Sequence, residues 1–321
     1  MFENLKRKIL NNDSLTPEEA LAVLNTDDRN VFYLFAITNE IRNSFKGSKI
    51  SFCSISNAKS GKCSEDCKFC AQSSHYKTDV NTYPLKSSKK LLREIDAVNT
   101  KGIISSLGLV TSGKGILSDH DFSIICETIA QYPDSINSCA SLGILTYEQC
   151  NQLKASGLKT LHHNLETAES FYPQICTTHS YQERLQTLKN AKDAGLQICC
   201  GGIFGLGESL EQRVEFAFAL KDVNPEGIPI NFLNPVEGTP FENNKILSPF
   251  ESLKIIAMFR LVHPQKTVLV GGGREKALRS LQSLMFVAGA NATITGDYLT
   301  TTGKNIKEDS QILKDLGFQN S

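Results

Sequence analysis

The chain has no net charge, because its 34 lysines and arginines are balanced by 34 aspartates and glutamates. Proteins that bind nucleic acid normally carry a basic excess, so this balance argues against a nucleic-acid partner. The local basic run Lys86-Ser-Ser-Lys-Lys is typical of the solvated start of a helix. No apolar run is long enough to span a bilayer, so no membrane partner is predicted.

A secretory signal is also missing from the sequence. The N-terminus, Met1-Phe-Glu-Asn-Leu-Lys-Arg-Lys, is charged and continues into Asn-Asn-Asp, where a signal peptide would have an apolar stretch. We therefore expect a cytoplasmic protein whose 10 cysteines stay reduced. This is a high number of cysteines for such a chain, and reduced cysteines favour metal binding over disulfides.

The most informative feature of the chain is a compact cysteine motif. In Cys63-Ser-Glu-Asp-Cys67-Lys-Phe-Cys70, three cysteines follow the spacing C-x3-C-x2-C within a polar segment. Such closely spaced thiolates can converge on one metal centre, and no fourth cysteine lies nearby to complete a closed site. On a cluster of four irons, three cysteine ligands leave one iron open to a small molecule. A zinc site completed by His75 is the alternative.

This spacing, with Phe69 directly before the last cysteine, resembles the radical S-adenosylmethionine superfamily. The surrounding Ser-Gly-Lys-Cys-Ser-Glu-Asp-Cys-Lys-Phe-Cys-Ala-Gln-Ser-Ser is similar to its biotin synthase family, and the resemblance extends over residues 48–318. It implies a [4Fe–4S] cluster on Cys63, Cys67 and Cys70 that reductively cleaves S-adenosylmethionine to methionine and a 5′-deoxyadenosyl radical. That radical would remove hydrogen from dethiobiotin, and sulfur from a second iron–sulfur cluster would close the ring of biotin.

The order of the predicted elements indicates a (β/α)8 TIM barrel with an N-terminal helical cap. Residues 1–46 have helical patterns, and we assign residues 1–47 to the cap and 48–321 to the barrel. From residue 48 onward, short β-prone runs alternate with amphipathic segments, as a parallel barrel requires. The predicted barrel helices cover 88–100, 119–131, 146–155, 181–194, 209–222, 249–262 and 274–288. A doubly wound open sheet is the alternative, and residues 307–321 are expected to fold back as a terminal helix.

In such a barrel, ligands bind at the carboxyl ends of the strands, where the unusual residues of this chain accumulate. The resemblance implies contacts with S-adenosylmethionine from Phe69, Asn164, Glu166, Arg184 and Ile203. It implies contacts with dethiobiotin from Asn164, Asn231, Thr300 and Thr301, and from His162, where the family commonly has asparagine. The Arg184 guanidinium could hold the methionyl carboxylate by paired hydrogen bonds, although an exposed helix arginine is the alternative. Side-chain amides offer both the donor and the acceptor that a urea group requires.

The second cluster of the family, a [2Fe–2S] centre held by three cysteines and an arginine, is matched only in part. Cys139 and Cys199 match two of the cysteines, whereas Gly108 and Leu269 stand where the third cysteine and the arginine are expected. Our hypothesis is that Cys53, on the first strand and beside both gaps, replaces a missing ligand, the alternative being a buried apolar thiol. Cys200 is a further candidate, but adjacent strand residues face opposite ways. The sequence predicts only packing roles for Cys126, Cys150 and Cys176.

The resemblance also implies a flavodoxin- or ferredoxin-type electron donor and a homodimer. Two rival interpretations stay open. The first is a related radical enzyme with another substrate, such as a maturase, which the departures at Gly108, Leu269 and His162 would allow. The second is an iron–sulfur storage or carrier protein, which would need neither Asn231 nor the two threonines.

Overall fold

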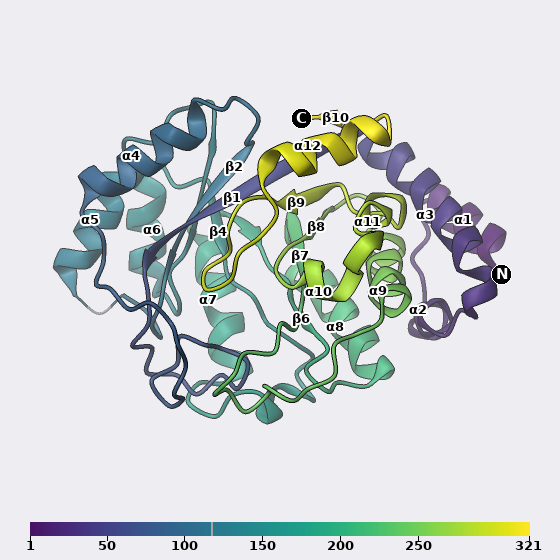
Figure 1. The fold of residues 1–321 in the computed structure, drawn as a ribbon, viewed down its shortest axis with the longest axis horizontal. Coiled ribbons are helices and arrows are strands. Elements are labelled where there is room, and N and C mark those ends of the chain that lie inside the picture. Colours follow the sequence, from purple (N-terminus) through teal and green to yellow (C-terminus); the bar gives the residue numbers. More distant parts are fainter. Residues whose placement is uncertain (117) are drawn as a thin grey trace.

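The computed structural model describes residues 1–116 and 118–321 and contains a closed barrel of parallel strands (Figure 1). The barrel strands are β1 (Lys49–Lys59), β2 (Ser106–Thr111), β3 (Asn137–Ser141), β4 (Thr160–His162), β5 (Gln197–Cys199), β7 (Gly227–Phe232), β8 (Thr267–Val270) and β9 (Ala292–Ile294). Each pairs in parallel with the next, and β9 pairs with β1. This closure confirms the predicted (β/α)8 fold and excludes the open sheet, which would leave two strands as edges.

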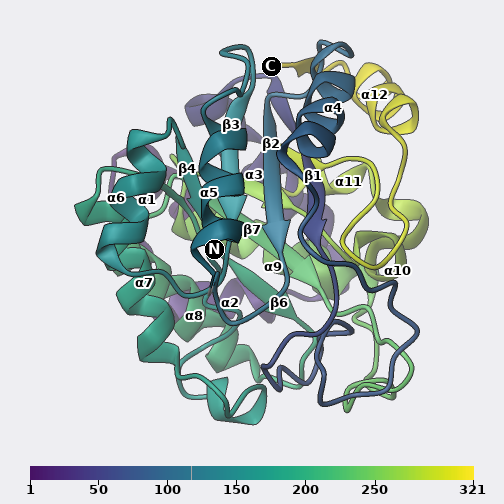
Figure 2. The same cartoon turned by 90° about the vertical axis from the view of Figure 1, so that its left-hand side faces the viewer.

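Helices cover the outside of the barrel, as Figure 2 shows for the side of β1 to β3. The connecting helices are α4 (Ser88–Asn99), α5 (Asp119–Ile129), α6 (Tyr147–Ala155), η2 (Tyr172–Gln174), α7 (Tyr181–Asp193), α8 (Leu210–Val223), α9 (Pro249–Val262), α10 (Arg274–Leu278), η3 (Arg279–Leu281) and α11 (Leu284–Val287). The prediction of one helix over 274–288 is wrong. Arg279 has a φ of 51°, which a right-handed helix cannot contain, so α10 ends before it.

Two short strands and a terminal helix complete the barrel domain. The strand β6 (Gly202–Phe204) follows β5 and pairs with the end of β7, and β10 (Gln319–Asn320) pairs with the start of β1. The helix α12 (Ile306–Asp315) confirms the predicted terminal helix, although it ends at Asp315 and the last part of the predicted span, 307–321, contains β10. Within residues 1–116 and 118–321, no helix is both long and apolar enough to cross a membrane.

The N-terminal segment is helical, as predicted, and packs outside the barrel (Figure 1). It contains α1 (Phe2–Leu10), α2 (Pro17–Leu24), η1 (Asp28–Asn30) and α3 (Val31–Lys46). Thr16 begins α2 in a capping box with Glu19, and Pro17 occupies the first turn. Because α3 contacts α9 and α11 and shares one hydrophobic core with them, the division between residues 47 and 48 stays a prediction.

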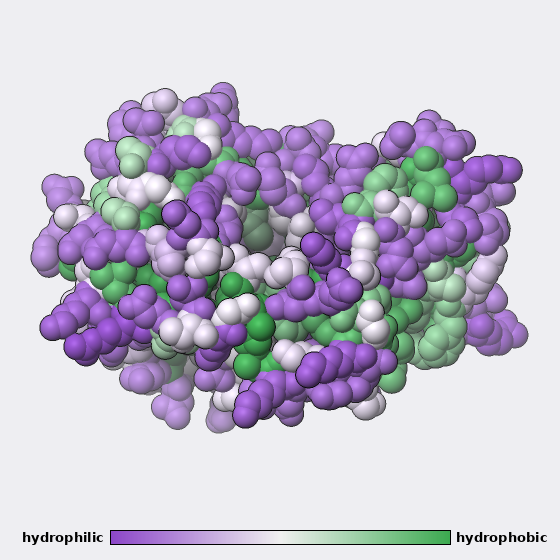
Figure 3. Space-filling view, turned by 90° about the horizontal axis from the view of Figure 1, so that it is seen from above, coloured by the Kyte–Doolittle hydropathy of each residue, from purple (hydrophilic) through white to green (hydrophobic). Residues whose placement is uncertain are grey.

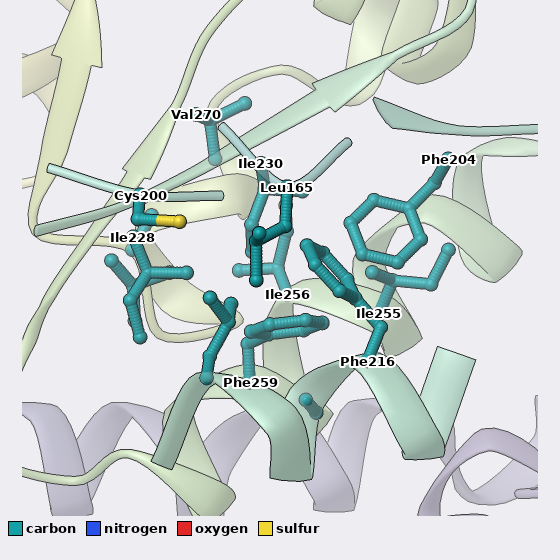
Figure 4. Close-up of a cluster of buried hydrophobic side chains, with 14 of the residues drawn as sticks. Leu165, Cys200, Phe204, Phe216, Ile228, Ile230, Ile255, Ile256, Phe259 and Val270 are labelled. Atoms are coloured by element: carbon teal, nitrogen blue, oxygen red, sulfur yellow. The ribbon is translucent and has the colours of Figure 1, made fainter. Parts of the chain in front are cut away.

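The hydrophobic core lies mainly between the strands and the outer helices, and Figure 4 shows part of it. Phe204 of β6, Phe216 of α8 and Phe259 of α9 pack with ring centroids 5.4 to 6.1 Å apart. Successive strand residues face opposite sides, so Ile228 and Ile230 of β7 both point into this outer layer. The other face of each strand lines the barrel interior, which is where the cysteines and polar residues described below are found.

A buried ion pair connects α12 to the barrel and to the loop that carries Thr300 and Thr301. The side chain of Arg274 is inaccessible, and it donates to Asp309 Oδ2 at 2.7 Å and to the Tyr298 hydroxyl at 3.2 Å. Removing one partner of a buried pair leaves an uncompensated charge, which typically costs about 3–5 kcal/mol. We expect the variant Asp309→Ala to lose about that much unfolding free energy in a denaturant titration.

The matched control is Asp315→Ala, because Asp315 lies on the same helix and bonds only the exposed Gln311 side chain at 2.7 Å. The unfolding free energy of this variant should stay within about 0.5 kcal/mol of that of the original protein. The double variant Arg274→Met with Asp309→Leu should recover part of the loss, since it leaves no unpaired buried charge. Equal destabilisation by the two aspartate variants would contradict the importance of the pair.

Candidate functional site

The loop that follows β1 brings the three motif cysteines together. Cys63 is fixed by two backbone hydrogen bonds, from its N–H to Gln72 O at 2.9 Å and from Ser74 N–H to its carbonyl at 2.7 Å. Cys70 N–H donates to Cys67 O at 2.9 Å. As a result the three side chains line one cavity of about 170 Å³. Among the described residues lining this cavity, Cys63, Cys67 and Cys70 are the only cysteines.

These thiols have the properties expected of ligands to a buried metal centre. Burial raises the pKa of Cys70 to about 11 and also raises the pKa of Cys63. The pKa of Cys67 is raised first by its hydrogen bond to Cys176 and then by burial. Such thiols stay protonated unless a cation binds them, so a cluster of iron ions would supply the charge that stabilises the thiolates. The donor set fits a cluster with one open position.

The alternative of a zinc site completed by His75 is not supported by the geometry. His75 Nε2 lies 2.9 Å from the carbonyl oxygen of Ser64, and the ring is exposed. Its side chain does not line the cavity that the cysteines share.

Three residues implied as S-adenosylmethionine contacts lie together beside this cavity. Arg184 Nη1 donates to Asn164 O at 3.0 Å and lies 3.7 Å from Glu166 Oε1. Arg184 is therefore not the exposed helix arginine of the alternative interpretation. Gly202 allows the close approach of the backbone here, because a Cβ at Gly202 would meet Glu166 O at 2.2 Å. Burial raises the pKa of the Glu166 carboxyl.

A second cavity, of about 360 Å³, adjoins the first and contains the residues implied in substrate binding. It is lined in part by Phe69, Ile203, Asn231, Thr300 and Thr301. The Asn231 amide is held by the backbone on both sides. Its Oδ1 accepts from Gly272 N–H at 2.8 Å, and its Nδ2 donates to Gly202 O at 3.2 Å.

The barrel lumen forms a third cavity, of about 320 Å³, and holds three more cysteines. Cys53, Cys139 and Cys199 line it, together with Gly108 and Leu269. Burial raises the pKa of Cys53 and of Cys139 to about 12, and the nearby Cys53 contributes to the shift at Cys139. Figure 3, viewed from the end of α12 and β10, shows a hollow near the middle of a mostly hydrophilic face.

Cys200 does not take part in this group. Figure 4 shows its side chain in the outer layer, near Leu165 and Ile228, and it is inaccessible. The candidate role of Cys200 as a ligand in the lumen is therefore wrong. The reason is the alternation of strand residues, because Cys199 faces the lumen and its neighbour must face the helices.

The three cavities meet at His162. His162, Val110 and Ser141 line the cysteine cavity, the substrate-side cavity and the lumen cavity alike. Burial lowers the pKa of His162 to about 4, so its ring is neutral at neutral pH and can both donate and accept a hydrogen bond. A reaction centre near His162 could therefore be reached from the motif cysteines on one side and from the lumen cysteines on the other.

The sequence predicted only packing for Cys176, but the structure brings it to the motif. Cys176 Sγ lies 3.7 Å from Cys67 Sγ and 3.3 Å from His179 Nδ1. Cys67, Cys176 and His179 also form a group whose ligand atoms lie within 4.8 Å of one another. The spacing Cys-x2-His in Cys176-Thr-Thr-His179 is a metal-ligand type of pattern and was the signal that could have found this group.

Two families match the chain. Residues 58–220 match the Radical SAM superfamily, and residues 229–319 match the Biotin and Thiamin Synthesis associated domain. A biotin synthase of Geotalea uraniireducens (strain Rf4) is 46% identical over 317 residues, covering 98% of this chain and 96% of the relative. A biotin synthase of Pelotomaculum thermopropionicum (strain DSM 13744 / JCM 10971 / SI) is 46% identical over 318 residues, covering 98% of each.

Solved structures share the fold at low sequence identity. Methylornithine synthase has a TM-score of 0.87 at 18% identity, covering 99% of this chain and 97% of that chain. The FeFe-hydrogenase maturase HydG from Carboxydothermus hydrogenoformans has a TM-score of 0.83 at 19% identity, covering 100% of this chain and 79% of that chain. These similarities concern the fold alone.

Proposed function

The chain belongs to the biotin synthase family of radical S-adenosylmethionine enzymes, and on that premise we propose that it inserts sulfur into dethiobiotin to form biotin. The observation that carries the proposal is the meeting of three cavities at His162, Val110 and Ser141. The motif cysteines, the substrate-side residues and the lumen cysteines then line three adjoining cavities. Sulfur insertion needs these three groups within reach of a single substrate, and an enclosed site excludes water and other hydrogen donors.

In this proposal Cys63, Cys67 and Cys70 hold a [4Fe–4S] cluster, and Arg184 with Glu166 orients S-adenosylmethionine beside it. When bound, the reduced cluster supplies the electron that cleaves S-adenosylmethionine. Arg184 is suited to a carboxylate because its guanidinium is already oriented, with Nε donating to the Tyr172 hydroxyl at 2.8 Å. Phe69, Asn164 and Ile203, which line the adjoining cavity, would contact the rest of the cofactor.

For dethiobiotin we propose contacts from the amides of Asn164 and Asn231 and from the neutral ring of His162. Both amides already bond backbone groups, Asn164 Oδ1 accepting from Gly201 N–H at 3.1 Å, so their orientation is set before substrate binds. His162 can donate to, or accept from, a urea group without introducing a charge. Thr300 and Thr301 line the same cavity, and the substrate carboxylate would lie beside them.

We propose that the sulfur comes from a second iron–sulfur cluster held in the lumen by Cys53, Cys139 and Cys199. The register supports this set, because Gly108 pairs with Cys139 on the next strand and leaves space there, whereas Cys53 lies on the other neighbour of β2. A glycine at 108 removes the side chain that would otherwise fill this part of the lumen. The electron donor would be a reduced protein of the flavodoxin or ferredoxin class, and a homodimer is also proposed.

The experiment that tests the proposal is anaerobic reconstitution with iron and sulfide, followed by reaction with dithionite, S-adenosylmethionine and dethiobiotin. Mass spectrometry should find biotin, which has gained one sulfur and lost two hydrogens relative to dethiobiotin. Cleavage of S-adenosylmethionine that does not depend on dethiobiotin would instead favour a related enzyme with another substrate. Protein that binds iron and sulfide but cleaves no S-adenosylmethionine would favour the carrier interpretation.

The role of Arg184 can be tested separately with the variant Arg184→Lys. Lysine keeps the charge but lacks the planar guanidinium, which can bond both Tyr172 and the methionyl carboxylate of S-adenosylmethionine. Losing a charge-assisted hydrogen bond costs about 1.5–3 kcal/mol, so the dissociation constant for S-adenosylmethionine should rise about tenfold or more. Isothermal calorimetry on the reconstituted protein measures this.

The matched control is Arg93→Lys, because Arg93 is an exposed arginine of α4. That variant should bind S-adenosylmethionine as the original does. Unchanged affinity in Arg184→Lys would remove Arg184 from the proposed contacts.

A further inference from the structure

A group of buried polar side chains lies next to Cys67, and two of its members, Glu65 and His179, also line the cysteine cavity. Cys176 Sγ is 3.7 Å from Cys67 Sγ, and Cys176 does not line the cavity that Cys63, Cys67 and Cys70 share. The series of contacts continues from Cys176 Sγ to His179 Nδ1 at 3.3 Å, and His179 Nδ1 lies 2.6 Å from Glu65 Oε2. Cys176, His179 and Glu65 are each at most 7% exposed. The proposed function uses none of these residues.

The hydrogen-bond partners determine which nitrogen of His179 carries the proton. Arg184 Nε lies 3.1 Å from His179 Nε2 and shares its single N–H between this nitrogen and the Tyr172 hydroxyl at 2.8 Å, and arginine can only donate. His179 Nε2 must therefore accept, and in the neutral ring the proton lies on Nδ1. From there it is donated to Glu65 Oε2 and toward the sulfur of Cys176. The Cys176 sulfur thus accepts on this side, and its own S–H is free to donate elsewhere.

Three acceptors lie within reach of the Cys176 S–H. One of them, Thr178 Oγ1 at 3.6 Å, already accepts from Asp66 N–H at 3.2 Å. Asp66 Oδ1 is 3.2 Å from Cys176 Sγ, but it also accepts from Thr177 N–H at 2.8 Å and from Thr178 N–H at 3.2 Å. Those two backbone donors match the two lone pairs of that oxygen. The remaining acceptor is the Cys67 sulfur. As a thiol Cys67 donates to Cys176, but once it is a thiolate bound to iron it can only accept.

We propose that Cys176 is a positioning residue that donates its S–H to the cluster-binding sulfur of Cys67. We further propose that His179 connects this hydrogen bond to Arg184. The inference rests on the proposed [4Fe–4S] cluster at Cys63, Cys67 and Cys70. A hydrogen bond to a cluster thiolate stabilises the reduced, more negative cluster more than the oxidised one, and so it raises the reduction potential. The same series of hydrogen bonds includes the guanidinium of Arg184, which is assigned to S-adenosylmethionine. The cluster environment and the cofactor site therefore share one set of hydrogen bonds.

The test is a potentiometric titration of the reconstituted protein, monitored by electron paramagnetic resonance, with iron and zinc analysis. Cys176→Ala removes the donor, so its cluster should be harder to reduce by about tenfold in the equilibrium constant, a shift of about 59 mV to lower potential. Cys176→Ser keeps an O–H donor at a shorter reach, so the reduction potential of its cluster should lie between those of the wild-type protein and of Cys176→Ala. The matched control is Cys150→Ala, since Cys150 is an equally buried thiol on α6 that lines none of the three cavities; its potential should not change.

The variant His179→Phe tests the connection to Arg184. It keeps a ring and removes both nitrogens, so we expect a lower potential together with at least a fivefold weaker binding of S-adenosylmethionine. Cys176→Ala should lower the potential while leaving that affinity within about twofold. Unchanged affinity in His179→Phe would remove the second half of the inference.

Each other outcome separates this inference from the proposed function. A wild-type protein without a [4Fe–4S] signal would end the proposed function itself. A wild-type cluster with an unchanged potential in Cys176→Ala would overturn only the role of Cys176. Loss of iron from both Cys176 variants would also overturn the donor role of Cys176. A hydrogen-bond donor is not needed to hold the cluster, so this result would make Cys176 a ligand. If the wild-type protein holds one zinc ion per chain and Cys176→Ala loses it, Cys176 is a zinc ligand and its proposed role as a donor is overturned. If the alanine variant does not fold, the potential and metal content of Cys176→Ser decide between these roles.

Discussion

Replacing any one of Cys63, Cys67 and Cys70 with alanine is expected to abolish the cleavage of S-adenosylmethionine. Each thiol lines the same cavity, so removing one leaves two ligands for a cluster that needs three. Without the cluster, the rate should fall to the uncatalysed background, a loss of about 10⁶-fold or more on the usual scale of enzymatic rate enhancement. Formation of 5′-deoxyadenosine under reducing, anaerobic conditions measures the rate, and iron and sulfide analysis measures the cluster.

Cys126→Ala is the matched control for these variants. Cys126 is a half-buried thiol of α5 that packs against the hydrophobic core and lines none of the three cavities. It should retain the full iron content and the full rate. A motif variant that keeps four irons and cleaves S-adenosylmethionine at the control rate would show that the cluster lies elsewhere.

The second large effect is expected from the adjacent pair Cys199 and Cys200. In Cys199→Ser, biotin formation should be lost while cleavage of S-adenosylmethionine continues, because Cys199 faces the lumen and not the motif cavity. In Cys200→Ser, both activities should persist. Cys200 lies in the apolar outer layer shown in Figure 4, so its replacement should cost only stability, about 1–3 kcal/mol for a buried hydroxyl.

Mössbauer spectroscopy of iron-57 protein distinguishes the two proposed clusters in these variants. The signal of the second cluster should disappear in Cys53→Ser, Cys139→Ser and Cys199→Ser, and persist in Cys200→Ser. A complete second cluster in Cys53→Ser would return Cys53 to the alternative of a buried apolar thiol. A complete one in Cys199→Ser would remove the lumen site altogether.

The rival interpretation of another substrate is not strengthened by the solved structures. Methylornithine synthase and the hydrogenase maturase share the fold at 18% and 19% identity, which a barrel of this type can keep across many activities. The relatives at 46% identity over nearly the whole chain are biotin synthases. His162, Gly108 and Leu269 remain the positions at which this chain departs from the expected pattern, and His162 is where the cavities meet.

The sequence alone determined the features that depend on local spacing. The C-x3-C-x2-C motif predicted convergent thiols, because residues a few positions apart in one loop cannot separate far. The alternation of β-prone and amphipathic segments predicted the barrel, because parallel neighbours need helical crossovers. Alternation within a strand also predicted that Cys199 and Cys200 would face opposite sides, and Figure 4 confirms it for Cys200.

Only the tertiary structure decided which distant residues meet. Cys67 and Cys176 lie 109 positions apart, and the packing of the 176–179 segment against the motif loop brings their sulfurs to 3.7 Å. The break of the helix at Arg279 likewise depends on one backbone angle that no pattern of apolar residues reports. Periodicity describes which face of an element is buried. The contacts made there depend on how the elements pack, and that is a property of the whole closed barrel.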